Sequence, residues 1–228
     1  SARKVLPENS AYWQSLNGDW KFNWARTPEE RPKDFYQTSF DVSGWDNIPV
    51  PSSWNIVGLQ KDGTQKYGTP IYVNQPVIFQ HKVAVDDWRG GVMRTPPENW
   101  TTFKDRNEVG SYRREFTIPE DWDGRNVFIS FDGVDSFFYL WINGHYVGFS
   151  KNSRNAANFN ITPYLQKGKN IVAAEVYRSS DGSFLEAQDM FRLPGIFRTV
   201  ALYSTPKVHF RDLVVTPDLD ATYTDGSL

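Results

Sequence analysis

Residues 131–144 read FDGVDSFFYLWING, and this stretch decides the fold class of the 228-residue chain. Residues 136–142 are mainly apolar and aromatic, and the dipeptide Asn143-Gly144 follows them directly. Asn-Gly between two apolar segments is the strongest short-range signal for a β-hairpin, because both turn residues must reach positive φ. Residues 146–149 (YVGF) supply the second strand. The stretch therefore predicts two antiparallel strands joined by a tight turn.

Similar segments recur on both sides of this hairpin. They are rich in β-branched and aromatic residues, and turn residues separate them. Residues 162–165 (TPYL) predict one short helix, with Pro163 at its first turn. Regularly spaced short strands indicate an all-β fold, an antiparallel β-sandwich with little helix. The predicted strands are residues 18–24, 112–118, 126–131, 170–177, 196–203 and 208–216.

Composition narrows the classes of function. The chain has 25 basic and 27 acidic side chains, so it offers no electrostatic basis for binding nucleic acid or an anionic membrane. Its mean hydropathy is −0.57, and no run of apolar residues is long enough to predict a membrane-spanning helix. There are no cysteines, which excludes disulfides and thiol catalysis. We expect a soluble protein, cytoplasmic or periplasmic, because the absence of cysteine suits both compartments.

Two stretches interrupt the strand pattern. Residues 86–109 contain Gly-Gly and Pro-Pro and follow neither the helical nor the strand period, which predicts a long inserted surface loop. The residues after Pro217 are turn-like. We therefore expect a sandwich domain over residues 1–207, with a boundary near residues 204–208. Residues 208–228 would then be a linker and the start of a truncated second domain.

The residues alone predict no catalytic site. A glycosidase needs two carboxylates roughly 5–10 Å apart, and 27 acidic residues leave the choice of pair open. The three histidines, His81, His145 and His209, are too scattered to predict a metal site. We expect all three to be structural, with His145 exposed beside the hairpin turn.

The segment after the strand that ends at residue 177 gathers the acids Asp181, Glu186 and Asp189. One hypothesis is structural: Ser-Asp-Gly-Ser forms an Asx turn, and the acids pair with arginines of the same segment. The other is functional: an acid at a domain edge accepts a sugar hydroxyl or binds a hard cation. Ligation by oxygen alone suits Na⁺, Ca²⁺ or Mg²⁺.

Five aromatic residues lie in predicted loops. Aromatic faces stack on the C–H faces of sugars, so one hypothesis is a carbohydrate-binding surface. In a free-standing carbohydrate-binding module, Trp88 and Trp100 would be its stacking platform. The alternative is that these rings cap the core of the sandwich. The five are Trp54, Tyr67, Tyr72, Trp88 and Trp100.

Six segments, in order, resemble the N-terminal sugar-binding domain of glycoside hydrolase family 2, and they look most like its β-galactosidase branch. The similarity spans about residues 10–216. The segments are LNGDWKF (residues 16–22), IPVPSSW (48–54), PIYVN (70–74), FDGVDSFFYLWING (131–144), VGFSKNSR (147–154) and SDGSFLEAQDMFRLPGIFR (180–198).

This resemblance implies a jelly-roll β-sandwich of the galactose-binding type, followed by an immunoglobulin-like domain and a (β/α)₈ barrel that carries both catalytic glutamates. No acid of this chain would then be catalytic. The parent protein would hydrolyse terminal β-D-galactosides, and this fragment would be inactive alone. The β-glucuronidase branch shares the sandwich and stays an alternative, although the Ser-Asp-Gly-Ser segment favours the galactosidases. The length of the loop at residues 86–109 leaves substrate size and linkage open.

The resemblance also assigns two substrate-binding residues. Asn74 matches the family asparagine beside the bound galactoside, and Asp181 matches the aspartate that contacts the galactose 6-hydroxyl and a Na⁺ ion. Other Na⁺ ligands would come from the barrel. Na⁺ and Mg²⁺ are therefore expected in the parent enzyme, and neither is expected to bind this fragment tightly. The expected partners are a galactoside, the remaining domains of the same chain and, in the full-length enzyme, a second copy in a homo-oligomer. A purely structural domain that supports the barrel is a further hypothesis.

Overall fold

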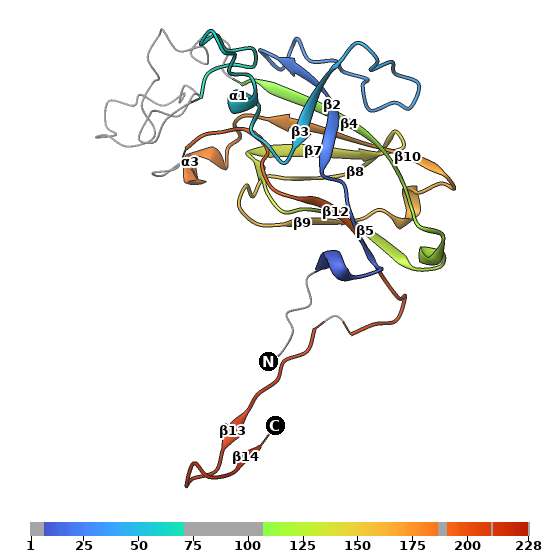
Figure 1. Ribbon diagram of the computed structural model, residues 1–228, viewed down its shortest axis with the longest axis vertical. Coiled ribbons are helices and arrows are strands. Elements are labelled where there is room, and N and C mark those ends of the chain that lie inside the picture. Colours follow the sequence, from blue (N-terminus) through green and yellow to red (C-terminus); the bar gives the residue numbers. More distant parts are fainter. Residues whose placement is uncertain (1–6, 71–106, 187–190, 211, 228) are drawn as a thin grey trace, which may run out of the picture.

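The computed structural model describes residues 7–70, 107–186, 191–210 and 212–227. Two antiparallel sheets face each other in a β-sandwich, which confirms the predicted fold class (Figure 1). The larger sheet has the order β3 (Asp46–Val50), β2 (Gly18–Ala25), β4 (Val109–Thr117), β10 (Lys169–Tyr177), β7 (Phe137–Ile142) and β8 (His145–Ser150). The smaller has the order β1 (Trp13–Ser15), β12 (Val200–Thr205), β5 (Asn126–Phe131) and β9 (Ala157–Asn160).

Short elements complete the described part of the chain. Two small pairs of strands are β6 (Val134–Asp135) with β11 (Gly195–Ile196), and β13 (Asp218–Leu219) with β14 (Gly226–Ser227). The helices are α1 (Trp54–Val57) and α3 (Ser183–Glu186), with 3₁₀ turns η1 (Pro7–Asn9), η3 (Glu120–Trp122) and η4 (Thr162–Tyr164). Within the described residues, none of these helices has the length or the apolar character to cross a membrane.

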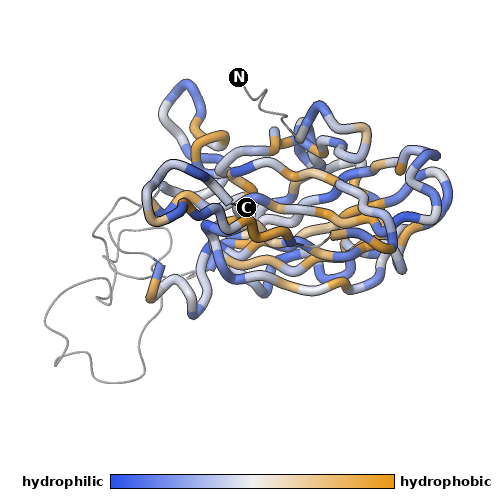
Figure 2. Tube along the Cα trace, turned by 90° about the horizontal axis from the view of Figure 1, so that it is seen from below, coloured by the Kyte–Doolittle hydropathy of each residue, from blue (hydrophilic) through white to orange (hydrophobic). Residues whose placement is uncertain are grey.

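The core lies between the two sheets and is strongly aromatic. Apolar and polar colours alternate along the strands in Figure 2, as expected where one face of each strand is buried. On β7, Phe138, Leu140 and Ile142 point inward and are fully buried, whereas the residues between them are partly exposed. Phe22 of β2 and Tyr112 of β4 bring their ring centroids to 4.8 Å. Aromatic burial on this scale stabilises the sandwich without disulfides.

The predicted hairpin is confirmed. Asn143 and Gly144 form the turn between β7 and β8, with φ of 50° and 84°. The Asn143 side chain also accepts from the Ile171 backbone at 2.8 Å and donates to Asn170 at 2.8 Å. The turn is therefore attached to the start of β10 as well as to its own strands.

Most of the other predicted elements are confirmed, with two corrections. The predicted strand 196–203 divides into β11 and β12. The predicted strand 208–216 is wrong, because none of its described residues belongs to a strand. Val208 and Phe210 are 92 % and 93 % exposed. An extended segment needs a neighbouring strand for its backbone hydrogen bonds. In the described structure, residues 208–216 have no such strand beside them, although apolar and polar residues alternate at the start of the segment.

The residues after β12 run away from the sandwich and end in the β13–β14 hairpin (Figure 1). The division into a domain at 1–207 and the start of a second domain at 208–228 stays a prediction. Residues 86–106 of the predicted inserted loop lie outside the described residues.

Candidate functional site

One end of the larger sheet carries Asp181 and Glu186, two of the polar residues that the sequence singled out. Strands β8 and β10 both end there, at Ser150 and Tyr177. The residues that follow them converge beside α3, and α1 lies at the same end (Figure 1). We refer to this end as the Asp181 edge.

Asp181 is presented to solvent at this edge. Its side chain is 74 % exposed, and one carboxylate oxygen lies 2.8 Å from the Lys151 ammonium. The other accepts from the backbone N–H of Gly182 at 2.9 Å. The hydrogen bond from Lys151 holds the pKa of Asp181 below its usual value, so the carboxylate is ionised at neutral pH. An ionised, accessible carboxylate of this kind accepts hydrogen bonds from hydroxyl groups.

The turn that carries Asp181 is closed by its flanking serines. The backbone N–H of Ser183 donates to the Ser180 carbonyl at 3.0 Å, and the Ser180 N–H donates to the Ser183 hydroxyl at 3.0 Å. A turn is therefore present, but it is a backbone β-turn and not the predicted Asx turn, because the Ser183 N–H donates to the Ser180 carbonyl and the Asp181 carboxylate accepts from Gly182. The prediction that Asp181 pairs with an arginine of its own segment is corrected: its partner is Lys151, thirty residues earlier in the chain.

Glu186 has a structural role at the Asp181 edge. It is the last residue of α3, and its carboxylate accepts from the Ser153 backbone at 3.1 Å and from the Ser153 hydroxyl at 2.5 Å. Ser153 is buried and also donates to the Ser136 carbonyl. These contacts fasten α3 to the loop after β8. Asp189, the third acid of the segment, lies outside the described residues.

Asp135 is a largely buried carboxylate at this edge, with its side chain 14 % exposed, and sequence reasoning missed it. It lies 3.5 Å from the Arg154 guanidinium. Burial raises the pKa of Asp135 to about 6, and the positive charge of Arg154 opposes this increase. Asp135 lies between the predicted strands at residues 126–131 and 136–142. Burial distinguishes Asp135 from the exposed acids, and the burial of an acidic residue cannot be predicted from its neighbours in the sequence.

Arg178, directly after β10, holds two distant parts of the chain. Its guanidinium lies 2.8 Å from the Glu108 carboxylate and donates to the Thr69 carbonyl at 2.7 Å. Next to it, Ser179 exchanges two hydrogen bonds of 2.9 Å with the Asn107 side chain. Thr69 and Asn107 are thus attached to Arg178 and Ser179, which precede Asp181 by three and two residues. Asn74 belongs to that segment and lies outside the described residues.

Of the five aromatic residues in predicted loops, the two that the structure describes, Trp54 and Tyr67, cap the core. Trp54 is fully buried and donates from its indole to Glu108 at 3.3 Å, and Tyr67 is buried as well. The carbohydrate-surface hypothesis is therefore wrong for these two residues. The remaining three, Tyr72, Trp88 and Trp100, lie outside the described residues.

The histidines contribute no metal site to the described structure. His145 and His209 are exposed, and His81 lies outside the described residues. Within the described ranges, no group of three or more His, Asp or Glu side chains is placed to hold a metal ion.

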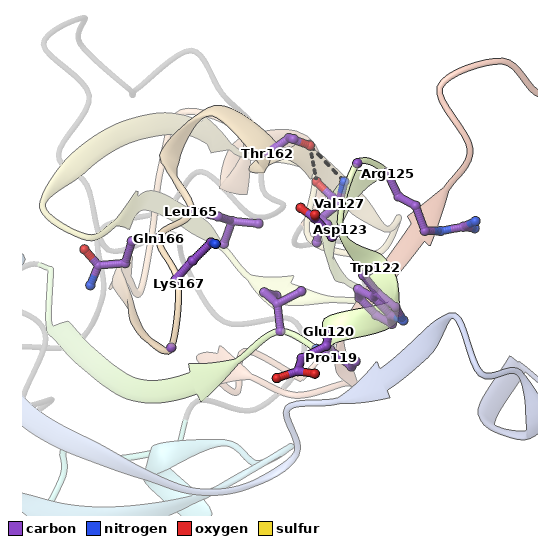
Figure 3. A pocket seen from close by; sticks show the side chains of 13 residues that line it. Pro119, Glu120, Trp122, Asp123, Arg125, Val127, Thr162, Leu165, Gln166 and Lys167 are labelled. Carbon is purple, nitrogen blue, oxygen red and sulfur yellow. Dashed lines mark hydrogen bonds between the residues drawn. The ribbon is translucent and has the colours of Figure 1, made fainter.

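A groove of about 480 Å³ lies at the other end of the sandwich (Figure 3). It is lined by η3, by Thr162 of η4 and by the turn that leads into β10. In the wall of this groove, the Thr162 hydroxyl accepts a hydrogen bond from the Val127 N–H and donates one to the Val127 carbonyl. Because the groove lies near the Lys169 end of β10 and Asp181 follows its Tyr177 end, the groove is separate from the Asp181 edge.

The fold and this edge define a class of protein: an antiparallel β-sandwich domain that presents an exposed carboxylate at its rim. The chain belongs to the family described as glycosyl hydrolases family 2, sugar binding domain, whose model matches residues 13–206. The match covers most of the chain and confirms the resemblance seen in the six sequence segments.

Relatives of known name support this assignment. The chain is 44 % identical over 221 residues to a β-galactosidase of Priestia megaterium, covering 97 % of this chain and 19 % of that protein. It is 39 % identical to the β-galactosidase large subunit of Lactobacillus helveticus, covering 98 % of this chain and 34 % of the relative. The chain therefore spans a fifth to a third of the length of these relatives.

A solved structure supports the fold. The β-glucuronidase of an uncultured Clostridium species superposes with a TM-score of 0.64 at 19 % sequence identity, covering 95 % of this chain and 33 % of the other. At this identity the likeness concerns the fold alone.

Proposed function

We propose that this chain is the sugar-binding domain of a β-galactosidase, an enzyme that hydrolyses terminal β-D-galactosides. In this proposal the chain completes the substrate pocket, and the catalytic acids lie elsewhere in the parent protein. The observation that carries it is the exposed, ionised carboxylate of Asp181 at the rim of the sandwich. The names of the relatives, β-galactosidases at 39–44 % identity, support the choice of sugar.

Asp181 would bind the galactose 6-hydroxyl. Lys151 and the Gly182 N–H each engage one carboxylate oxygen. Every carboxylate oxygen has two lone pairs, so both oxygens can still accept from a sugar hydroxyl. The contacts between Glu186 and Ser153 fix α3, which follows the Asp181 turn, so the carboxylate is held in place before substrate arrives.

Asn74 would be the second galactoside-binding residue. Its assignment rests on the motif PIYVN. The attachment of Thr69 to Arg178 and of Asn107 to Ser179 supports a common site, because Asn74 and Asp181 each follow one of these contacts by only a few residues along the chain.

The described residues do not make up a Na⁺ site by themselves. Asp181 is a single carboxylate, and the Lys151 ammonium already lies 2.8 Å from one of its oxygens. Na⁺ and Mg²⁺ of the parent enzyme would therefore take most of their ligands from outside this chain, and the chain alone would bind neither tightly. Titration of the chain with either ion, followed by nuclear magnetic resonance, measures this.

The decisive experiment uses the full-length parent protein and the substitution Asp181→Asn. We expect a raised KM for nitrophenyl β-galactoside and a weaker dependence of KM on Na⁺, because the amide lacks the negative charge of the carboxylate. Asp121→Asn on η3, an exposed acid of the same type, is the matched control. Unchanged KM in Asp181→Asn would remove Asp181 from the site, and galactoside turnover by this chain alone would overturn the proposal.

The same assay separates the β-glucuronidase alternative, whose branch of the family shares the sandwich. A β-galactosidase turns over nitrophenyl β-galactoside and leaves nitrophenyl β-glucuronide largely intact. The reverse preference would assign the chain to the other branch. The oligomeric state of the full-length enzyme, proposed to be a homo-oligomer, is measured by light scattering.

A further inference from the structure

We propose that the outer side of the larger sheet carries a docking surface for the remaining part of the parent polypeptide. The surface consists of the outward rings of β7, β8 and the end of β10, and we name it the aromatic face: Phe137, Tyr139, Tyr146, Phe149 and Tyr177. The inference rests on the proposed function in two respects: it takes this chain as one domain of a longer glycosidase, and it takes Asp181 as part of the substrate pocket.

The five rings form one continuous cluster. Phe137 and Tyr139 lie on the side of β7 that points away from the core. The Phe137 ring centroid lies 4.7 Å from that of Tyr139, 5.7 Å from that of Tyr177 and 5.9 Å from that of Phe149. Tyr139 reaches Tyr146 at 6.2 Å. The side chains at the edge strand, Tyr146 and Phe149, are 50 % and 53 % exposed.

The other half of the same sheet face is already covered by the chain itself. Residues 26–45 cross β4 and β10, where the Arg113 guanidinium donates to the backbone carbonyls of Phe35, Gln37 and Phe40. This cover reaches the border of the aromatic face at two places. The ring of Tyr36 stacks on that of Trp141, with centroids 5.0 Å apart, and Arg31 lies 3.2 Å from the Glu175 carboxylate. Among the described residues of the aromatic face, Tyr146 and Phe149 stay at least half exposed.

The chemistry of the aromatic face suits contact with another protein surface. None of its five side chains is charged, and the Tyr177 hydroxyl is turned to the buried Glu175 carboxylate, to which it donates at 2.7 Å. Contiguous exposed aromatic patches mark interaction sites, and aromatic residues are enriched in the cores of protein interfaces.

Two observations favour the parent polypeptide as the occupant. The named relatives are three to five times as long as this chain, since it covers 34 % or 19 % of them. The aromatic face also runs directly into the Asp181 edge: Phe149 lies two residues before Lys151, and Tyr177 lies four before Asp181. A catalytic domain that meets substrate at Asp181 must approach this edge, and the adjoining rings are the nearest uncharged surface for it to cover.

Hydroxyl-radical footprinting of the full-length parent protein tests the docking. We expect Tyr146 and Phe149 to be oxidised at least fivefold more slowly than Tyr12, which is 43 % exposed on the other side of the sandwich. The protection should persist when the protein is diluted until it is monomeric, and it should not depend on added sugar. Equal oxidation of Tyr146, Phe149 and Tyr12 overturns the proposal.

Loss of protection on dilution would instead assign the face to a second copy of the chain, and protection that requires a galacto-oligosaccharide would assign it to a glycan. Either result also overturns the proposal. Phe149→Lys in the full-length protein should lower the midpoint of thermal unfolding, whereas Asn158→Lys, an exposed position on β9, should not. Galactoside hydrolysis by the wild-type protein is measured separately, so failure of the docking proposal is distinct from failure of the proposed function.

Discussion

The guanidinium of Arg178 lies 2.8 Å from the carboxylate of Glu108, and the two side chains are 1 % and 3 % exposed. This buried ion pair joins the end of β10 to the residue before β4, and Arg178 also donates to the Thr69 carbonyl. A buried charge that loses its partner carries the full cost of its desolvation. The pair is therefore a structural requirement for the chain that leads into Asp181, which follows Arg178 by three residues.

Replacement of Arg178 by methionine should lower the free energy of unfolding by about 3–5 kcal/mol, because it leaves the Glu108 carboxylate buried and unpaired. The double variant Arg178→Met/Glu108→Leu should be more stable than Arg178→Met alone. Lys66→Met is the control, since the pair of Lys66 with Asp46 is largely exposed and should contribute less than about 1 kcal/mol. Urea denaturation measures all three, and a loss below about 1 kcal/mol for Arg178→Met would contradict the prediction.

The stability of the domain should fall as the pH rises through the range in which Asp135 ionises. Burial raises the pKa of Asp135 from 3.8 to about 6. Between these two values the folded chain keeps a proton that the unfolded chain has released, so a higher pH favours unfolding. Two pKa units correspond to about 3 kcal/mol. The stability of Asp135→Asn relative to wild type should therefore increase by up to about this amount between pH 4 and pH 7.

Urea denaturation at several pH values gives this difference. Asp121→Asn, an exposed acid on η3, should show a small and nearly constant difference from wild type. A difference for Asp135→Asn that is equally flat with pH would show that Asp135 is not buried as described.

Lys151→Met should change the titration of Asp181 without unfolding the chain, since both side chains are exposed. The ammonium holds the pKa of Asp181 below its usual value, so its removal should raise that pKa. As the pH is lowered, protonation of Asp181 should raise KM. In the full-length Lys151→Met enzyme, this rise in KM should begin at a higher pH than in wild type. Carboxyl resonances in nuclear magnetic resonance report the pKa directly. The control Lys167→Met, at the distant groove, should leave the pKa of Asp181 at its wild-type value. An unchanged pKa of Asp181 in Lys151→Met would contradict the prediction.

Gly110→Ala should destabilise the core by about 1–3 kcal/mol. A methyl group at this position would lie 2.7 Å from the Trp54 ring and 2.8 Å from the Phe22 ring, closer than packed carbon atoms approach. Gly44→Ala is the matched control, because a methyl group there meets no atom within 4 Å. Thermal unfolding of the two variants compares them, and equal midpoints would rule out the tight packing of β4 against α1.

Part of the fold was predictable from short windows of sequence. The hairpin at Asn143-Gly144 is confirmed because positive φ and period-2 alternation are properties of neighbouring residues. The same alternation at residues 208–216 misled, because a strand also needs a partner, which the described structure does not supply. Strands β1, β3 and β9 were missed because they are only three to five residues long, too short for alternation to distinguish a strand from a loop.

The residues of the candidate site also divide into those that were predictable from the sequence and those that were not. Asp181 was identified from a local motif and its resemblance to a family. Its partner Lys151 and the buried Asp135 were not, because their contacts depend on which strand ends meet at one edge of the sheet. The sequence by itself determined an all-β sandwich, its central hairpin and the family, since these follow from turn residues, periodicity and motif order. Only the tertiary structure decided which carboxylate is exposed and which is buried, because burial and electrostatic pairing depend on groups far apart in the chain.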